Sequence, residues 1–232
     1  MNLFTVDIDW APEEVIEDTL RLFEEYHVQC TIFATHKSSI IDGCNRRRFE
    51  IGIHPNFNPL LFEGRHSTTD TILQDILTLY PEAKGVRSHS LTQNSYFVYK
   101  FAEMGLKYDA NTFLPYWKDI KPYRMWNNFM RVPYNWEDDI HFLYKKDYRD
   151  CELDLNTSLI NIFGFHPIHV YLNTECENRY QEAKKDIKNP EALLKHRNLK
   201  TYGTRNFLIS LLTEQQRQRN ESVKLIDILN SF

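Results

Sequence analysis

The stretch FTVDIDWAP, residues 4–12, places two carboxylates at the end of a run of β-formers, just before a tryptophan and a proline. A buried charge without a partner is costly, so a buried strand rarely ends in this way. Asp7 and Asp9 share one face if the strand persists through both, and they diverge if it ends at Asp7. Either way the carboxylates repel each other unless one is protonated or a cation lies between them. A divalent ion removes the repulsion, so this stretch is a candidate metal site.

The rest of the composition is that of a globular protein. The 232 residues predict a single domain, 1–232, with 42% hydrophobic residues available for its core. The formal net charge of −4 gives no reason to expect a nucleic-acid partner. No apolar run approaches the roughly 20 residues of a membrane helix. The four cysteines form no CxxC pair, and no signal-peptide pattern opens the chain, so we expect a cytoplasmic protein.

Strand-like and helix-like segments alternate along the first two thirds of the chain. We predict strands at 3–8, 29–34, 49–53, 84–87, 105–111, 129–134 and 161–166, and helices at 12–27, 68–80 and around 95–104. The C-terminal third is predicted to be largely helical. This alternation is typical of parallel strands joined by helices, which indicates an α/β fold, either an open sheet or a barrel.

Polar and titratable side chains recur where these predicted strands end. They are Asp7, Asp9, His36, His54, Asn58, Arg87, His89, Asp109, His166 and His169. Parallel α/β folds bind ligands at the carboxyl ends of their strands, so the repetition predicts one shared site. Asp9 and His54 would supply one oxygen and one nitrogen, a mixed donor set that suits zinc.

The motifs FTVDIDW, EIGIHPNFNP, GVRSHS, GLKYDAN, RVPYNWEDD and FGFHP occur in this order between residues 3 and 170. In this order they resemble the NodB-type polysaccharide deacetylases of carbohydrate esterase family 4. The resemblance is strongest to the branch tied to O-antigen and surface-glycan gene clusters. It implies a distorted (β/α) barrel, a divalent metal that is usually zinc, and hydrolysis of an N-acetyl group on a sugar.

The resemblance also implies catalytic roles for individual residues. Asp7 matches the family's catalytic base, Arg87 the arginine that holds that base, and His166 the general acid. Asp9 and His54 match two metal ligands. The family usually has its two aspartates adjacent, whereas Ile8 separates them here.

The third metal ligand and the substrate contacts are less closely matched. Asn58 stands where the family has a second metal-binding histidine, and an amide oxygen is a poorer zinc donor than an imidazole. The third ligand therefore stays open between Asn58, His89 and His36. Trp136 and Asp138, or Asp139, loosely resemble the fourth motif. We expect His89, Trp136 and Asp138 at the substrate.

Two functions from different classes fit these residues. The first is a metal-dependent hydrolase that removes an N-acyl group, most simply acetyl, from a sugar intermediate of surface-polysaccharide biosynthesis, or from another small amide. The second is a non-catalytic glycan-binding module with a degraded site, which Asn58 and the inserted Ile8 motivate. The presence of base, metal ligands and acid together favours the hydrolase. The sequence leaves open the sugar, the acyl group, the metal and the oligomeric state.

Overall fold

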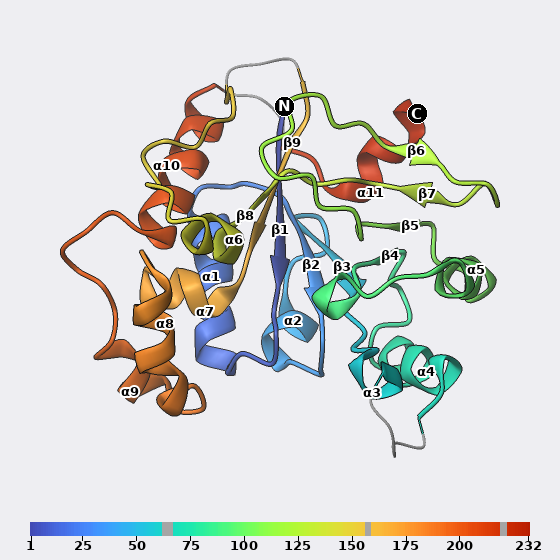
Figure 1. Cartoon of the computed structure of the whole chain (residues 1–232), viewed down its shortest axis with the longest axis horizontal. Helices are drawn as coiled ribbons and strands as arrows, with labels where there is room; N and C mark the ends of the chain where they lie inside the picture. Colours follow the sequence, from blue (N-terminus) through green and yellow to red (C-terminus); the bar gives the residue numbers. More distant parts are fainter. Residues whose placement is uncertain (62–66, 156–158, 219–221) are drawn as a thin grey trace.

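A curled mixed sheet forms the centre of the molecule (Figure 1). The computed structural model of the chain describes residues 1–61, 67–155, 159–218 and 222–232. Within these residues the sheet has nine strands in the order β6-β7-β5-β4-β3-β2-β1-β9-β8. The strands are β1 (Asn2–Asp7), β2 (Cys30–Ala34), β3 (Phe49–Ile53), β4 (Gly85–Val86), β5 (Tyr108–Asp109), β6 (Tyr123–Arg124), β7 (Met130–Arg131), β8 (Trp136–Glu137) and β9 (Asn161–Phe165). Neighbouring strands are parallel except β6 and β7, which are antiparallel.

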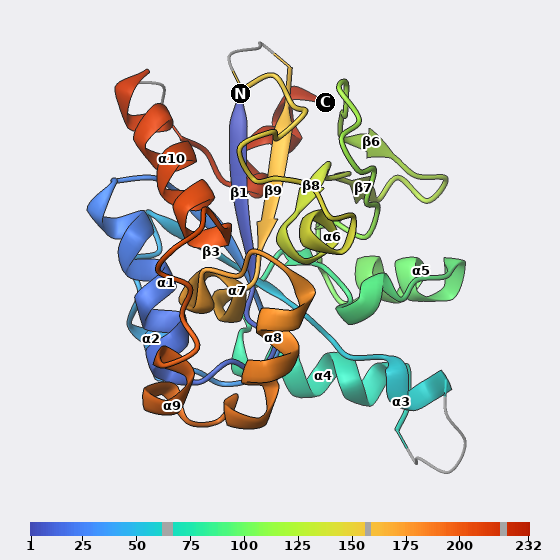
Figure 2. The same cartoon turned by 60° about the vertical axis from the view of Figure 1, so that its left-hand side comes forward.

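Helices cover the outside of the curl (Figure 2). They are α1 (Glu13–Glu25), α2 (Ser39–Gly43), α3 (Asn58–Leu61), α4 (Thr69–Leu79), α5 (Ser95–Glu103), α6 (Asp138–Leu143), α7 (Pro167–Leu172), α8 (Glu177–Ala183), α9 (Pro190–Leu194), α10 (Thr204–Arg217) and α11 (Leu225–Ile228), with 3-10 turns η1 (His89–Leu91), η2 (Lys184–Asp186) and η3 (Leu229–Ser231). In the described part of the chain, no helix is both long and apolar enough to cross a bilayer.

The residues of β1 alternate between two hydrophobic clusters. Phe4 and Val6 belong to the larger cluster, which the helices cover, whereas Leu3 belongs to a smaller cluster inside the curl. Thr5 and Asp7 lie two and four residues after Leu3, so they share its inward face. The first strand therefore carries an apolar outer face and an inner face that becomes polar toward its carboxyl end.

Helix α11 closes the curl at the end opposite to those carboxyl ends. Its Leu225 and Ile228 are buried in the inner cluster. The N–H of Leu225 donates to the Thr31 hydroxyl at 3.0 Å, and the N–H of Ile226 donates to the Glu50 carboxylate at 3.0 Å. Both acceptors lie near the amino ends of their strands. Helix α11 thus covers the amino ends of β2 and β3, whereas the polar inner face of β1 lies toward the carboxyl ends.

The predicted fold class is confirmed, because parallel strands joined by helices curl into the distorted barrel that the resemblance implied. The long strands lie close to their predicted ranges. Strands predicted at 105–111 and 129–134 shrink to β5 and β7, two residues each. The reason is that their neighbours in this part of the sheet are equally short, so the hydrogen-bond ladder cannot extend further.

Candidate active site

Asp7 ends β1 on its inner face and pairs with a buried arginine. Nη1 of Arg87 lies 3.0 Å from Oδ1 of Asp7 and donates to the Thr5 hydroxyl at 2.9 Å. The Arg87 guanidinium stacks on the Tyr134 ring, 4.1 Å from its centroid. Although burial opposes it, the charge of Asp7 raises the pKa of Arg87. The pair is therefore ionic, and the arginine holds one carboxylate oxygen in place.

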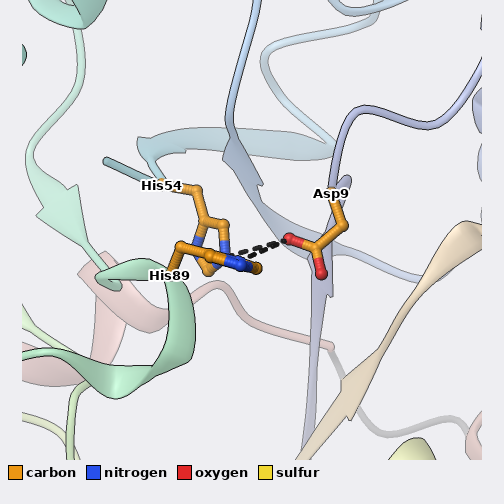
Figure 3. Close-up of side chains that lie close together, drawn as sticks. All are labelled: Asp9, His54 and His89. Carbon is orange, nitrogen blue, oxygen red and sulfur yellow. Dashed lines mark hydrogen bonds and ion pairs between the residues drawn. The ribbon is translucent and has the colours of Figure 1, made fainter. Parts of the chain in front are cut away.

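Asp9 follows β1 in a turn, and its carboxylate points toward two histidines, His54 and His89 (Figure 3). Oδ1 of Asp9 lies 3.2 Å from Nε2 of His54 and 3.2 Å from Nδ1 of His89. Although burial opposes it, hydrogen bonds from these two histidines hold the pKa of Asp9 well below its usual range. The two aspartates of the opening motif thus diverge in their hydrogen bonds, because Asp7 pairs with Arg87 whereas Asp9 pairs with His54 and His89.

The backbone of neighbouring strands positions both histidines. The N–H of His54, at the end of β3, donates to the carbonyl of Ala34 at 2.7 Å. His89 begins η1, and its N–H donates to the carbonyl of Pro55 at 3.0 Å. On the side away from Asp9, Nδ1 of His54 is 3.9 Å from Oδ2 of Asp7, which is longer than a hydrogen bond. His54 therefore lies between the two aspartates.

The side-chain contacts of Asn58 and His36 are with hydroxyl groups. The amide of Asn58 is 3.4 Å from the Ser90 hydroxyl and accepts from the Thr92 hydroxyl at 3.4 Å. These hydroxyls follow His89, so Asn58 braces the turn that carries that histidine. His36 is paired through Nδ1 with the hydroxyl of Thr35 at 2.9 Å. Of the three side chains left open as third ligand, the structure brings His89 to Asp9 and His54.

Asp9, His54 and His89 are chemically suited to a divalent metal. One carboxylate oxygen and two imidazole nitrogens all lie within 4.8 Å of one another. This mixed oxygen and nitrogen set is typical of zinc sites that keep an open position. Among the described residues, the buried Nδ1 of His54 has no hydrogen-bond partner. A metal-ligating histidine commonly turns its second nitrogen toward a carboxylate, as His54 does toward Asp7. The residues present therefore fit the ion.

His166 lies across the cluster from His54 and is held by a buried carboxylate. Its Nδ1 is 2.7 Å from Oδ1 of Asp138, and its N–H donates to Oδ2 of Asp138 at 2.8 Å. Its Nε2 is free of Asp138 and lies 3.7 Å from Oδ2 of Asp9. Although burial opposes it, the charge of Asp138 raises the pKa of His166 well above its usual range. Asp138 therefore stabilises a protonated imidazole whose Nε2 faces the cluster.

A cavity of about 390 Å³ opens beside these groups. Asp9, His89 and His166 contribute its polar wall. Its other lining residues come from the turn after β1 and from α6, α7 and α8, and they include Trp10, Phe142, Tyr180, Asp139 and Glu177. The cavity thus joins the reactive groups to a mixed aromatic and acidic surface.

Two residues expected at the substrate lie in the interior. Trp136 is only 1% exposed, and its ring packs among Phe163, Phe165 and Phe207. Asp138 is fully buried beneath His166. The structure therefore gives Trp136 a packing position and Asp138 an orienting one. His89, in contrast, lies in the wall of the cavity, as expected.

Sequence reasoning missed Trp10 and Tyr180, which both line the cavity. Trp10 directly follows the candidate ligand Asp9 in the sequence, and this adjacency could have indicated that it lies at the site. Tyr180 lies on α8, far along the chain from the residues of the opening motif that line the cavity. No pattern in the sequence connects this helix to the strand ends.

The family of the chain follows from comparison with known proteins. A family model for WbmS-like polysaccharide deacetylases matches residues 4–184. The chain belongs to this family. No curated protein was found to match it.

The chain is also similar to solved structures of polysaccharide deacetylases and of a carbohydrate esterase. WbmS from Bordetella bronchiseptica, assigned as a polysaccharide deacetylase of O-antigen biosynthesis, is 40% identical, with a TM-score of 0.82 over 92% of this chain and 90% of that one. A family 4 carbohydrate esterase from Streptomyces lividans is 10% identical, with a TM-score of 0.51 over 96% of each chain. A polysaccharide deacetylase from Mycobacterium smegmatis is 13% identical, with a TM-score of 0.54 over 99% of this chain and 88% of that one. The last two likenesses concern the fold.

Proposed function

We propose that this protein hydrolyses an N-acyl group, most simply acetyl, from a sugar used in surface-polysaccharide or O-antigen biosynthesis. We further propose that it uses one divalent metal, with zinc as the expected ion. Family membership and the O-antigen role assigned to its 40% identical relative support the reaction class and the pathway. The observation that carries the proposal is the convergence of Asp7, the Asp9–His54–His89 cluster and His166 beside one cavity.

In this proposal Asp9, His54 and His89 hold the metal, and Asn58 supports the turn of His89. When bound, a divalent ion supplies a Lewis acid that polarises the acyl carbonyl and lowers the pKa of a nearby water. Carboxylate and imidazole ligands leave such an ion an open position for this chemistry.

Asp7 acts as the base that accepts a proton from water. Arg87 occupies Oδ1 of Asp7, so Oδ2 is the oxygen that takes the proton. Arg87 does not reach the substrate and is therefore a positioning residue.

His166 gives a proton to the departing amine from Nε2. Its Nδ1 is held by Asp138, which fixes the ring and stabilises its protonated form. An amine is a poor leaving group until it is protonated, so this step completes the cleavage. Asp7 would thus take a proton and His166 would give one, and their side chains lie in one group whose ligand atoms are within 4.8 Å of one another.

The cavity is suited to the sugar part of a substrate. Among the described residues, the cavity lining contains no lysine or arginine, and its carboxylates at Asp139 and Glu177 would repel phosphate. If the sugar is joined to a phosphate carrier, the phosphates would therefore lie outside this cavity. The acyl-bearing ring would lie within it.

An acetate-release assay tests the proposed function. Zinc-loaded protein is incubated with N-acetylglucosamine, N-acetylgalactosamine and their uridine diphosphate conjugates, beside Asp7→Asn as the inactive control. Acetate release by the wild type, absent in Asp7→Asn, supports the hydrolase. Sugar binding without acetate release, unaffected by a chelator, would favour the non-catalytic module.

A further inference from the structure

Trp10 occupies a backbone position at which glycine is usual. The turn from Ile8 to Ala11 is closed by the N–H of Ala11, which donates to the carbonyl of Ile8 at 2.8 Å. Its central residues, Asp9 and Trp10, have φ angles of 39° and 55°. Positive φ at both central residues is the type I′ pattern, which favours Asp at the first position and Gly at the second. Asp9 suits its place, whereas a bulky residue at the second is an outlier.

The indole at this strained position does not pack into the core. Trp10 is 48% exposed and lines the cavity that Asp9, His89 and His166 also line. Its ring meets the His89 ring edge to face, with centroids 5.0 Å apart and an interplanar angle of 77°. Backbone strain at a residue whose side chain lines a cavity, and does not enter the core, points to a role at that cavity.

Other lining residues of the cavity supply the groups that a sugar ring needs. Phe142 and Tyr180 add apolar surface, and Asp139 and Glu177 add carboxylates that can accept hydrogen bonds from hydroxyls. A pyranose has a face of C–H bonds and a rim of hydroxyls. Aromatic rings pack well against such an apolar face. The chemistry of the cavity therefore matches one sugar ring beside the metal cluster.

We propose that Trp10 is a specificity-determining residue, a platform on which the pyranose ring that bears the acyl group packs by its C–H face. This inference rests on the proposed function, because it assigns the sugar subsite of the same active site. The platform lies one residue after Asp9, so a ring packed on it would direct its acyl group toward Asp9 and His89. An acyl compound without a sugar ring would gain nothing from the platform.

Two variants and two substrates test the platform. Trp10→Gly removes the ring and suits the positive φ, and Trp10→Phe keeps an aromatic face. Each zinc-loaded variant is assayed with the fastest of the four acetylated sugars named above and with ethyl thioacetate, which has no ring. The ratio of kcat/KM for the sugar to kcat/KM for the thioester should fall at least tenfold in Trp10→Gly, mainly through KM. In Trp10→Phe it should stay within about threefold of wild type.

Stability separates the platform from a structural role. Trp10→Gly should raise the Tm of the metal-free protein by about 2–4 °C, because glycine adopts positive φ without strain. An unchanged sugar-to-thioester ratio in Trp10→Gly would overturn the platform. So would an equal loss with both substrates, since that is the signature of a disturbed metal cluster.

Failure of the proposed function would look different. Wild-type protein that releases acetate from none of the four sugars would contradict the deacetylase proposal. In that case, isothermal titration calorimetry with the same sugars tests the proposed platform by comparing sugar binding to wild type and to Trp10→Gly. Weaker binding to Trp10→Gly than to wild type supports it, and equal or undetectable binding to both proteins overturns it.

Discussion

Nδ1 of His166 and its own main-chain N–H both meet the carboxylate of Asp138, at 2.7 and 2.8 Å. One buried side chain thus sets the position, the orientation and the charge of the proposed general acid. Because Asp138 is fully buried, it acts through His166 and does not reach a substrate.

Replacing Asp138 by Asn should lower kcat about 10- to 100-fold and leave KM little changed. An asparagine side chain has one acceptor oxygen, whereas the carboxylate has two. It can therefore no longer accept from both the main-chain N–H and the Nδ1–H of His166. Steady-state kinetics of acetate release measures this. Asp147→Asn is the control, since Asp147 is exposed and pairs with Arg149. Full kcat in Asp138→Asn would contradict the orienting role.

Arg87→Met should destabilise the protein by about 3–5 kcal/mol, because it leaves the buried Asp7 carboxylate without its partner. The double variant Arg87→Met with Asp7→Asn should be less destabilised than Arg87→Met alone. Urea unfolding of chelator-treated protein gives both free energies of unfolding. Equal destabilisation of the single and the double variant would show that Arg87 does not compensate Asp7.

The stability of the protein should depend on pH through Glu137. Burial, and then the charge of Asp139, raise the pKa of Glu137 to about 8 from its usual 4.5. Between these values the folded state keeps a proton that the unfolded state has released. The free energy of unfolding therefore falls as pH rises from about 4.5 to about 8.

Glu137→Gln removes this titration while its amide oxygen can still accept from the Tyr134 hydroxyl, now 3.0 Å from Glu137. Relative to wild type, the variant should become more stable as pH rises across that window. Urea unfolding of both metal-free proteins at pH 5 and pH 8 measures the difference. If the stability of Glu137→Gln relative to wild type is the same at both pH values, or falls as pH rises, the raised pKa of Glu137 is contradicted.

Leu225→Ala should lower the free energy of unfolding by about 2–5 kcal/mol, because Leu225 is fully buried in the inner cluster. The active site lies at the other end of the curl, so KM for a turned-over sugar should not change. Leu199→Ala is the matched control, since Leu199 is 86% exposed and should lose less than about 0.5 kcal/mol. A raised KM in Leu225→Ala would connect α11 to the site.

The sequence predicted what depends on local pattern. The alternating residues of β1 indicated a strand that ends at a site, and the order of motifs indicated the family, which comparison confirmed. The α/β class and the distorted barrel were confirmed as well. These features could be predicted because strand periodicity and motif order are properties of the sequence itself and do not depend on how distant segments pack.

What the sequence could not predict depends on backbone geometry and on distant segments. The divergence of Asp7 and Asp9 follows from positive φ in the turn after β1. The meeting of His89 with Asp9 depends on how η1 returns toward β3. The sequence around an aromatic residue such as Trp136 does not reveal whether its side chain faces solvent, and Trp136 lies in the core.

The central claim is that Asp9, His54 and His89 hold one divalent ion. Elemental analysis of zinc-loaded, desalted wild type, His54→Ala, His89→Ala and Asn58→Ala tests it most directly. We expect about one equivalent of metal in wild type and in Asn58→Ala, and little in either histidine variant. Metal kept by His89→Ala and lost by Asn58→Ala would contradict this ligand set, and no metal in any of the four proteins would contradict the metal mechanism itself.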